Sequence, residues 1–305
     1  RHYILDTQLP EITSVSPTND STINDSTPTV TIQLNEEGDC KFDFSDVGYD
    51  SATYDCTGDG TTTATCNIPD LGSDGDKYIY VACEDLAGNK DNSSTNTLIH
   101  YVLDTTPPVS SDYNPPTNSY INDTTPTFTF TTNEDADCYA STVDESYDDM
   151  IANGRPHCTS GSLSISHNCT MYDLGSDGSK DIYIACRDAY YNKDEPPNEY
   201  VTYILDTAKP YTTGITPVND SYITTQTPTI NLWLSENSTC KYDFSDVDYD
   251  SASYDCTGDG TTTATCNIPD LGSDGDKWIY FACRDTEGNK DTIDTNKHIH
   301  YVLDR

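Results

Sequence analysis

Residues 40–91 return almost unchanged as residues 240–291, with eight of the fifty-two positions different. Between these copies lies a more divergent relative, from Cys138 to Asp194. A repeat of about 100 residues indicates a linear array of similar units. Such an array favours reach, repetition or multivalent contact over catalysis, because an enzyme gains little from copying its scaffold.

The units share the same landmarks in the same order. Each opens with a Pro-Thr/Val-Asn turn and a Thr-Pro-Thr strand start, and each then carries four cysteines and an Asp-Leu-Gly-Ser-Asp-Gly turn. Each ends with Tyr-Val/Ile-Leu-Asp. We therefore predict three domains, at residues 8–106, 107–208 and 209–305, each of a size that supports one small core.

The hydrophobic pattern indicates β-strands. The segment from Thr29 to Leu34 alternates apolar and polar residues, and its counterparts at 127–130 and 229–234 do the same. Cys40, Phe42 and Phe44 also alternate with polar residues, which predicts an inward-facing row. Short strands separated by Gly, Asp, Asn and Pro turns, with no amphipathic helix of useful length, are typical of an all-β sandwich.

The cysteines indicate disulfides and an oxidising compartment. No Cys-x-x-Cys spacing is present, so neither a zinc site nor a redox motif is indicated. Four cysteines per unit allow three pairings, and we favour the one that joins two strand ends and closes one short loop. The predicted pairs are Cys40 with Cys83, Cys56 with Cys66, Cys138 with Cys186, Cys158 with Cys169, Cys240 with Cys283, and Cys256 with Cys266.

Seven Asn-x-Ser/Thr sequons fit an extracellular glycoprotein, although such sequons are common by chance in a chain rich in Ser, Thr and Asn. No stretch approaches about 18 apolar residues, so we expect neither a signal peptide nor membrane insertion, and we interpret the chain as the mature part of a longer surface protein. The sequons are at Asn19, Asn24, Asn92, Asn122, Asn168, Asn219 and Asn237.

The net charge of −37 and the isoelectric point near 4.1 argue against binding to nucleic acid or anionic lipid. They favour a solvated acidic surface, with divalent cations as the alternative. Calcium is the most credible ligand, because Asp70, Asp74 and Asp76 offer hard oxygens at alternating positions. Asp270, Asp274 and Asp276 repeat this arrangement, and Asp85 and Asp104 lie near a domain joint.

The competing interpretation is that Asp-Gly only forms a tight turn before the next strand. The second unit supports it, because Ser179 replaces the third aspartate there. We therefore expect no cofactor, with calcium as the exception to test.

Catalytic signatures are missing from the sequence. The six histidines are His2, His100, His157, His167, His298 and His300. His2, His100 and His300 share one position of the repeat, which marks a structural slot. No nucleophile elbow, phosphate loop or His-Glu-x-x-His motif is present, so we do not expect an enzyme.

Surface aromatic residues give a second interaction hypothesis. If Cys83 points inward, Tyr78 and Tyr80 face outward, as do Trp278 and Tyr280 in the third unit and Ile182 and Ile184 in the second. Such a stripe can be a packing face between chains or a platform for sugars. The alternative is that a neighbouring loop covers it.

Two strings carry a family resemblance. Cys40 to Ser45 and Tyr80 to Asn89, with linkers such as Leu103 to Pro108, resemble the immunoglobulin-like repeats of prokaryotic, especially archaeal, cell-surface proteins. The resemblance covers the whole chain and implies three tandem immunoglobulin-like β-sandwich domains. Such proteins serve as stalks, adhesins, surface-layer parts and filament subunits, so the resemblance alone does not choose a function.

A spare copy of the last strand is the sharpest indication of assembly. Residues 1–7 match the endings of all three units, giving four copies for three domains. This copy either completes a preceding domain or crosses to another subunit and pairs with a sheet there. The predicted assembly residues are His2, Tyr3, Ile4 and Leu5.

The sequence thus predicts a structural subunit of an extracellular filament or surface appendage, assembled end to end by β-strand addition. Its expected partner is itself. The alternative is the stalk of a cell-surface adhesin or surface-layer protein that binds surface glycans.

Overall fold

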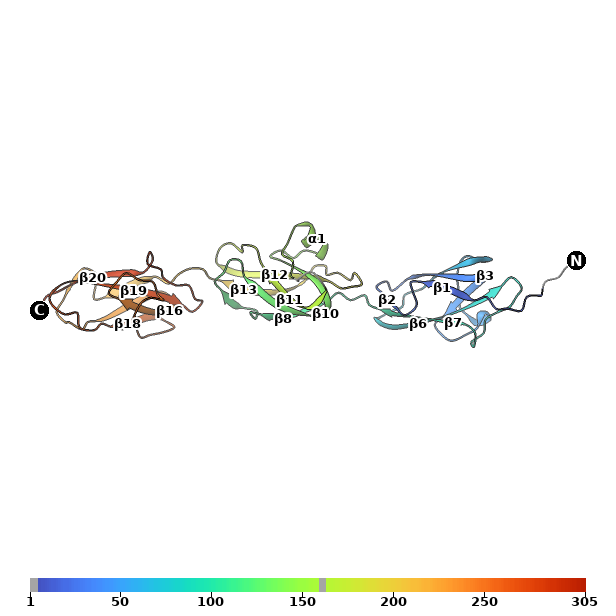
Figure 1. The fold of residues 1–305 in the computed structure, drawn as a ribbon, viewed down its shortest axis with the longest axis horizontal. Coiled ribbons are helices and arrows are strands. Elements are labelled where there is room, and N and C mark those ends of the chain that lie inside the picture. The colour runs from blue at the N-terminus through green and yellow to red at the C-terminus, as the bar shows by residue number, and fades with distance from the viewer. Residues whose placement is uncertain (1–4, 159–162) are drawn as a thin grey trace. The chain divides into compact units, whose positions relative to one another are not determined.

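The computed structural model describes residues 5–158 and 163–305. Its strands form three separate sheets of seven, six and seven strands, one in each repeat (Figure 1). All strands of the first sheet lie within residues 8–106, those of the second within 107–208 and those of the third within 209–305. No helix in the described part of the chain is long and apolar enough to span a membrane.

The first domain has the strand order β1-β3-β6-β7-β2, and β4 and β5 also pair with β3. A short 3₁₀ helix, η1, covers Tyr49–Ser51. The strands are β1 (Ile12–Ser16), β2 (Ser21–Ile23), β3 (Thr29–Asp43), β4 (Tyr54–Asp55), β5 (Thr61–Asn67), β6 (Gly75–Asp85) and β7 (Thr97–Leu103).

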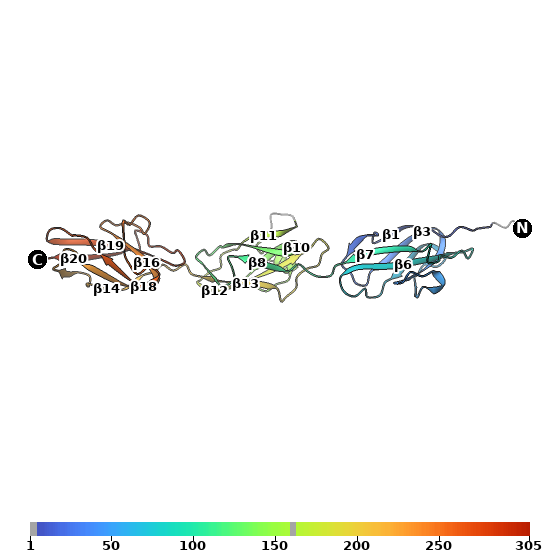
Figure 2. The same ribbon diagram turned by 90° about the horizontal axis from the view of Figure 1, so that it is seen from below.

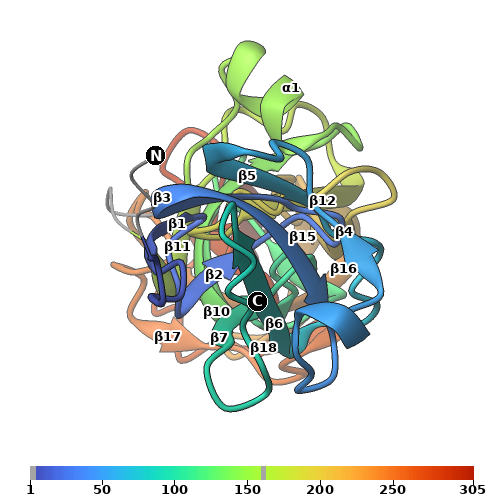
Figure 3. The same cartoon turned by 90° about the vertical axis from the view of Figure 1, so that its right-hand side faces the viewer.

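The 15-residue strand β3 connects the two layers of this sandwich. Its first half pairs with β1 and β5, its second half pairs with β4 and β6, and the register shifts between Gln33 and Gly38. Figure 3 shows β3 between β5 and β6, and Figure 2 shows β6 beside β7. A bulge of this kind lets one strand change sheets.

The layers enclose a core of alternating strand residues, as the sequence pattern predicts. Ile32, Ile79 and Ile99 are fully buried at its centre. Tyr101 is also fully buried, and its hydroxyl donates a hydrogen bond of 2.7 Å to the Pro17 carbonyl oxygen. One prediction for this row is wrong: Phe44 is 39% exposed, because β3 ends at Asp43 and the inward alternation ends with it.

The third domain repeats the first. Its sheet has the order β14-β16-β19-β20-β15, with β17 and β18 also paired to β16. The strands are β14 (Thr212–Thr216), β15 (Ser221–Ile223), β16 (Thr229–Asp243), β17 (Tyr254–Asp255), β18 (Thr261–Asn267), β19 (Gly275–Asp285) and β20 (Lys297–Leu303).

The middle domain keeps the plan and adds a helix, α1 (Tyr147–Ala152), which Figure 1 shows at its margin. The hydroxyl of Ser146 accepts a hydrogen bond from the Asp149 amide and caps this helix. The strands are β8 (Ser110–Asn114), β9 (Ser119–Ile121), β10 (Thr127–Ser141), β11 (Ser164–Thr170), β12 (Gly178–Arg187) and β13 (Glu199–Leu205).

Six disulfides join the cysteine pairs that the sequence predicts, two in each domain. Cys40 and Cys83 lie directly opposite each other on β3 and β6, and Cys240 and Cys283 do the same on β16 and β19. Each of these bonds therefore crosslinks two neighbouring strands. The chain is all-β, with three tandem immunoglobulin-like sandwich domains, each with two disulfides.

Candidate functional sites

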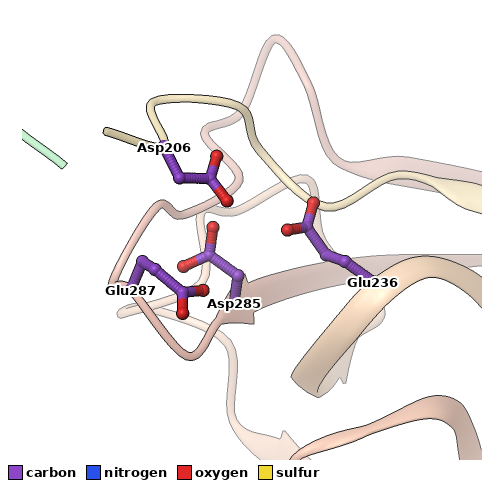
Figure 4. A group of neighbouring side chains, drawn as sticks. All are labelled: Asp206, Glu236, Asp285 and Glu287. Carbon is purple, nitrogen blue, oxygen red and sulfur yellow. The ribbon is translucent and has the colours of Figure 1, made fainter. Parts of the chain in front are cut away.

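Four carboxylates converge at one end of the third domain (Figure 4). Asp206 follows β13, Glu236 lies in β16, Asp285 ends β19 and Glu287 lies in the loop that follows. One oxygen from each lies within 4.8 Å of the others, and only Asp285 is buried. We call these four residues the third acidic cluster.

The same arrangement recurs in the other two domains. Asp6, Glu36 and Asp85 form the first acidic cluster. Asp104, Glu134 and Asp188 form the second. Each cluster thus combines three kinds of residue. They are the aspartate of the Leu-Asp pair that ends the preceding last-strand sequence, a glutamate of the long strand, and an aspartate at or directly after the end of a cysteine-bearing strand.

The fold places these groups by two devices. The glutamates lie where the long strand shifts register, for example between Trp233 and Ser238, and a bulge there re-aims a side chain. The aspartate at the strand end is held by the loop after it. Asp285 accepts hydrogen bonds from the Asn289 backbone amide at 2.7 Å and from the Asn289 side chain at 2.7 Å.

The same asparagine also fixes the Leu-Asp segment. The Asn289 side chain donates to the Asp206 carbonyl oxygen at 2.9 Å, and the matching distance from Asn192 to Asp104 is 3.0 Å. Each cluster is therefore held by hydrogen bonds that do not use up all of its carboxylate oxygens.

Burial and the neighbouring acids raise the pKa of Glu236 and of Asp206 above the ordinary carboxyl range. Burial also raises the pKa of Glu134, with the charges of Asp104 and Asp188 adding to the effect. Asp85 is different, because hydrogen bonds from Asn89 and nearby backbone amides outweigh its burial and lower its pKa. The clusters thus concentrate repulsion that protonation relieves, and their oxygens are of the type that hard divalent cations prefer.

The turn aspartates predicted as calcium ligands mostly hold local structure. Asp70 accepts a hydrogen bond from the Gly72 amide at 3.0 Å, and Asp74 accepts one from the Thr105 amide at 3.0 Å. Asp76 lies 3.1 Å from a ring nitrogen of His100. These contacts match the turn interpretation, whereas Asp85 and Asp104 enter acidic clusters.

The sequence analysis did not predict the glutamates of the acidic clusters, although their spacing from the cysteines is a signal. Glu36, Glu134 and Glu236 each precede the first cysteine of their domain by four residues. An alternation pattern places them as ordinary strand residues and does not show the bulge that turns them toward the aspartates.

The repeated histidine slot is structural, as its recurrence indicates. His100 lies between Asp20, 2.9 Å from Nδ1, and Asp76, 3.1 Å from Nε2. His300 lies in the same way between Asp220 at 3.0 Å and Asp276 at 3.1 Å. Hydrogen bonds that the rings donate to these pairs of carboxylates raise the pKa of both imidazoles.

The aromatic stripe exists in the outer domains. Tyr78 and Trp278 are each 48% exposed. For the middle domain the prediction is wrong, because Ile182 and Ile184 are fully buried and Asp181 takes the place of Tyr78. The predicted register of the middle repeat was wrong by one residue, and a shift of one residue reverses the face of a strand.

All seven sequon asparagines are exposed, which attachment of a glycan requires. The side-chain oxygen of Asn19 accepts a hydrogen bond of 2.8 Å from the His100 amide, and Asn219 does the same for His300. Of the predicted assembly residues, His2, Tyr3 and Ile4 lie outside the described residues, and Leu5 is 87% exposed.

No protein-family profile and no curated protein matches the chain. Among solved structures, it is similar to a mutated three-immunoglobulin fragment of titin, at 10% identity and a TM-score of 0.40, covering 98% of this chain and 99% of that one. It is also similar to a tetra-tandem repeat from the extending region of a large adhesion protein, at 15% identity, a TM-score of 0.31 and coverages of 95% and 74%.

A third similar structure is the human desmocollin-1 ectodomain, at 11% identity, a TM-score of 0.32 and coverages of 94% and 59%. At these identities and scores, the similarity carries no argument about function.

Proposed function

We propose that the chain is a structural subunit of an extracellular filament or cell-surface appendage, laid end to end and joined through its spare last strand. The supporting observation is that β7, β13 and β20 already fill the last-strand position of all three domains. The fourth copy of this sequence, residues 1–7, is therefore one more than the three last-strand positions take.

Burial within the last strands shows how strongly this sequence favours a sheet. Leu103, Leu205 and Leu303 are each 1% exposed, in contrast to Leu5 at 87%. A full leucine side chain moved from water into a core contributes about 2 kcal/mol. The exposed Leu5 side chain therefore gains if its segment pairs with a sheet elsewhere.

Other features fit a durable extracellular part. Two disulfides per domain stabilise sandwiches whose overall hydrophobic content is only 34%. The net charge of −37 makes neighbouring molecules repel one another. Association is therefore expected only through specific segments such as the spare strand. A prokaryotic surface and a non-enzymatic role are parts of this proposal.

The second candidate is the stalk of an adhesin or surface-layer protein. The filled last-strand positions of all three sheets are equally consistent with it, because the spare strand then closes a further domain of the same chain. In that case the modules are joined covalently and the protein does not polymerise.

The size of the purified chain in solution separates the two candidates. We expect concentration-dependent linear oligomers by light scattering, and fibres by negative-stain microscopy. Leu5→Asp should abolish both, whereas the exposed control Gln8→Asp should not. A monomer at every concentration for the unmodified chain would exclude the filament and favour the stalk.

A further inference from the structure

A hollow of about 300 Å³ lies on the surface of the third domain. Asp276, Lys277 and Trp278 lie at the start of β19, and Phe244 directly follows β16. The connection between β18 and β19 adds its own side chains. The full lining is Phe244, Asp270, Leu271, Asp276, Lys277 and Trp278.

The indole of Trp278 is held in place and still accessible. It packs against the imidazole of His300, with ring centroids 4.7 Å apart and an interplanar angle of 32°. Two carboxylates hold that imidazole in turn, as described above. Because Trp278 is 48% exposed, it offers an aromatic surface that needs little rearrangement to receive a ligand.

A second ring and an aliphatic side chain extend this apolar surface. Phe244 is 39% exposed and packs edge-on against Tyr254, with centroids 5.7 Å apart. Leu271 packs partly against the core and also lines the hollow. The apolar part of the hollow is thus built from three side chains that are anchored in the domain.

The polar part of the hollow is nearly balanced in charge. Asp276 faces His300, while Asp270 uses one oxygen to accept a hydrogen bond of 2.8 Å from the Gly272 amide. Among the described residues, Lys277 forms no ion pair. A free ammonium group and a free carboxylate oxygen are therefore available at the rim of an aromatic surface.

We propose that this hollow binds a neutral pyranose sugar. The C–H face of the sugar stacks on Trp278 beside Leu271, and its hydroxyl groups donate to Asp270 and accept from Lys277. A pocket of this volume, lined by aromatic and apolar side chains with a few polar groups, is of the kind that holds small-molecule ligands, and ionised groups form strong hydrogen bonds with hydroxyl groups. The site goes beyond the structural role proposed above, because it gives the chain a recognition function of its own.

The three domains differ at this site in an informative way. The first domain repeats five of the six lining residues and has Tyr78 in place of Trp278. Tyr78 packs against His100 with centroids 5.0 Å apart. The middle domain has Thr142 and Asp181 at the two aromatic positions, so we expect it not to bind sugar.

The two tryptophans of the chain make the test direct. Both Trp233 and Trp278 lie in the third domain, so Trp233→Phe leaves Trp278 as the only indole. The full-length variant is screened on a glycan array with neutral hexoses, N-acetylhexosamines, deoxyhexoses, sialylated glycans and sulfated glycans. The neutral glycans that bind are then titrated while the fluorescence of Trp278 is recorded.

We expect at least one neutral glycan to bind and to change the Trp278 emission in a saturable way. Trp278→Ala should weaken binding by about tenfold or more. The affinity of Trp278→Tyr should lie between that of the alanine variant and that of the protein with Trp278. The tyrosine variant should fold normally, because the first domain has tyrosine in the same surroundings. Unchanged melting curves for these variants show that the domain is intact.

Three results would overturn the proposal. The first is the absence of binding by every neutral glycan. The second is binding that leaves the Trp278 emission unchanged. The third is saturable quenching by an oligolysine peptide but by no sugar, which would assign the hollow to basic side chains of a protein partner.

Discussion

Where the first and third domains have Ala64 and Ala264 in their cores, the middle domain has His167. This imidazole stacks on Phe130, with centroids 4.7 Å apart, and its Nε2 lies 2.9 Å from the Thr132 hydroxyl. The outer domains have Leu34 and Leu234 at the position of Thr132. A polar pair has thus replaced an apolar pair without a change of fold.

The outer domains place a histidine elsewhere, on the surface of the last strand between two carboxylates. At this position the middle domain has Thr202, whose hydroxyl donates to Asp181 at 2.7 Å. One scaffold therefore carries a buried imidazole whose pKa is lowered and, in its neighbours, half-buried imidazoles whose pKa is raised. The comparison teaches that two positions of one architecture can shift the pKa of an imidazole in opposite directions.

Loss of a strand-joining disulfide should have the largest effect, and an equal one in both kinds of domain. Cys138 and Cys186 are 48 residues apart, against 43 for Cys240 and Cys283. The chain-entropy relation gives about 4 kcal/mol for either loop. Replacing each pair by alanines should therefore cost the two domains the same stability within experimental error, measured by domain-resolved hydrogen exchange. A much smaller loss in the middle domain would show that loop closure does not set its stability.

Arg155→Ala should destabilise the middle domain by about 2 kcal/mol. Arg155 donates two hydrogen bonds of 2.6 Å to Glu145, whose side chain is only 14% exposed. These bonds lower the pKa of Glu145, so their contribution is present above the unfolded pKa and is lost as pH falls through the folded one. The matched control is Lys290→Ala in the third domain, where the pair with Asp250 is more exposed and should matter less. Equal losses in the two variants would contradict this ranking.

His167 should destabilise the middle domain in mild acid, where it opposes the gain in stability from Asp194, whose pKa burial raises to about 7. Burial lowers the pKa of His167, although the charge of Asp137 opposes and that of His157 assists this shift. Below the unfolded pKa near 6.5 the unfolded chain binds a proton that the folded domain resists, which costs on the order of 1 kcal/mol. Hydrogen exchange between pH 7.5 and pH 5 should therefore show that His167→Gln gains stability relative to the unmodified chain as the pH falls. An unchanged difference in stability between the two proteins across this pH range would exclude a contribution from His167.

Glu236→Gln should stabilise the third domain by roughly 0.5 kcal/mol at neutral pH in the presence of EDTA. The raised pKa values of Glu236 and Asp206 mean that their stabilising contribution is full below the unfolded pKa and is lost as pH rises through the folded one. Removing one charge should recover part of that loss. Tryptophan fluorescence during denaturation reports the third domain alone, and Asp259→Asn, an exposed acid outside the cluster, is the control. A loss of stability in Glu236→Gln would show that the cluster is not repulsive.

His300→Thr should have the smallest effect on stability, and the direction in which that effect changes with pH is the result to look for. Because Asp276 and Asp220 raise the pKa of His300, its contribution is full below the unfolded pKa and disappears as pH rises through the folded one. The variant should therefore lose stability in mild acid and little at pH 8. Since Trp278 packs on this ring, its fluorescence reports the change, with the exposed His298→Thr as control. Indistinguishable behaviour of the two variants would exclude a stabilising role for the carboxylate pair.

The sequence predicted the sandwich and all six disulfides because alternation and cysteine spacing are local and recur in three copies. It did not predict α1, since a helix of six residues is too short to show a hydrophobic period. The sequence predicted the acidic clusters only in part, for a different reason. Their glutamates depend on a bulge between Gln33 and Gly38, which only the pairing of β3 with both layers reveals.

The bond between β3 and β6 has a mechanical consequence. Under a pulling force applied to the ends of the chain, residues between Cys40 and Cys83 bear no load, because the sulfurs carry it across the 43-residue interval. Roughly 150 Å of extended backbone is thereby withheld in the first domain, and similar lengths are withheld in the others. Even if a sandwich unfolds under force, its disulfide limits how far that domain can extend, so the tension is transmitted to the next domain after a short extension.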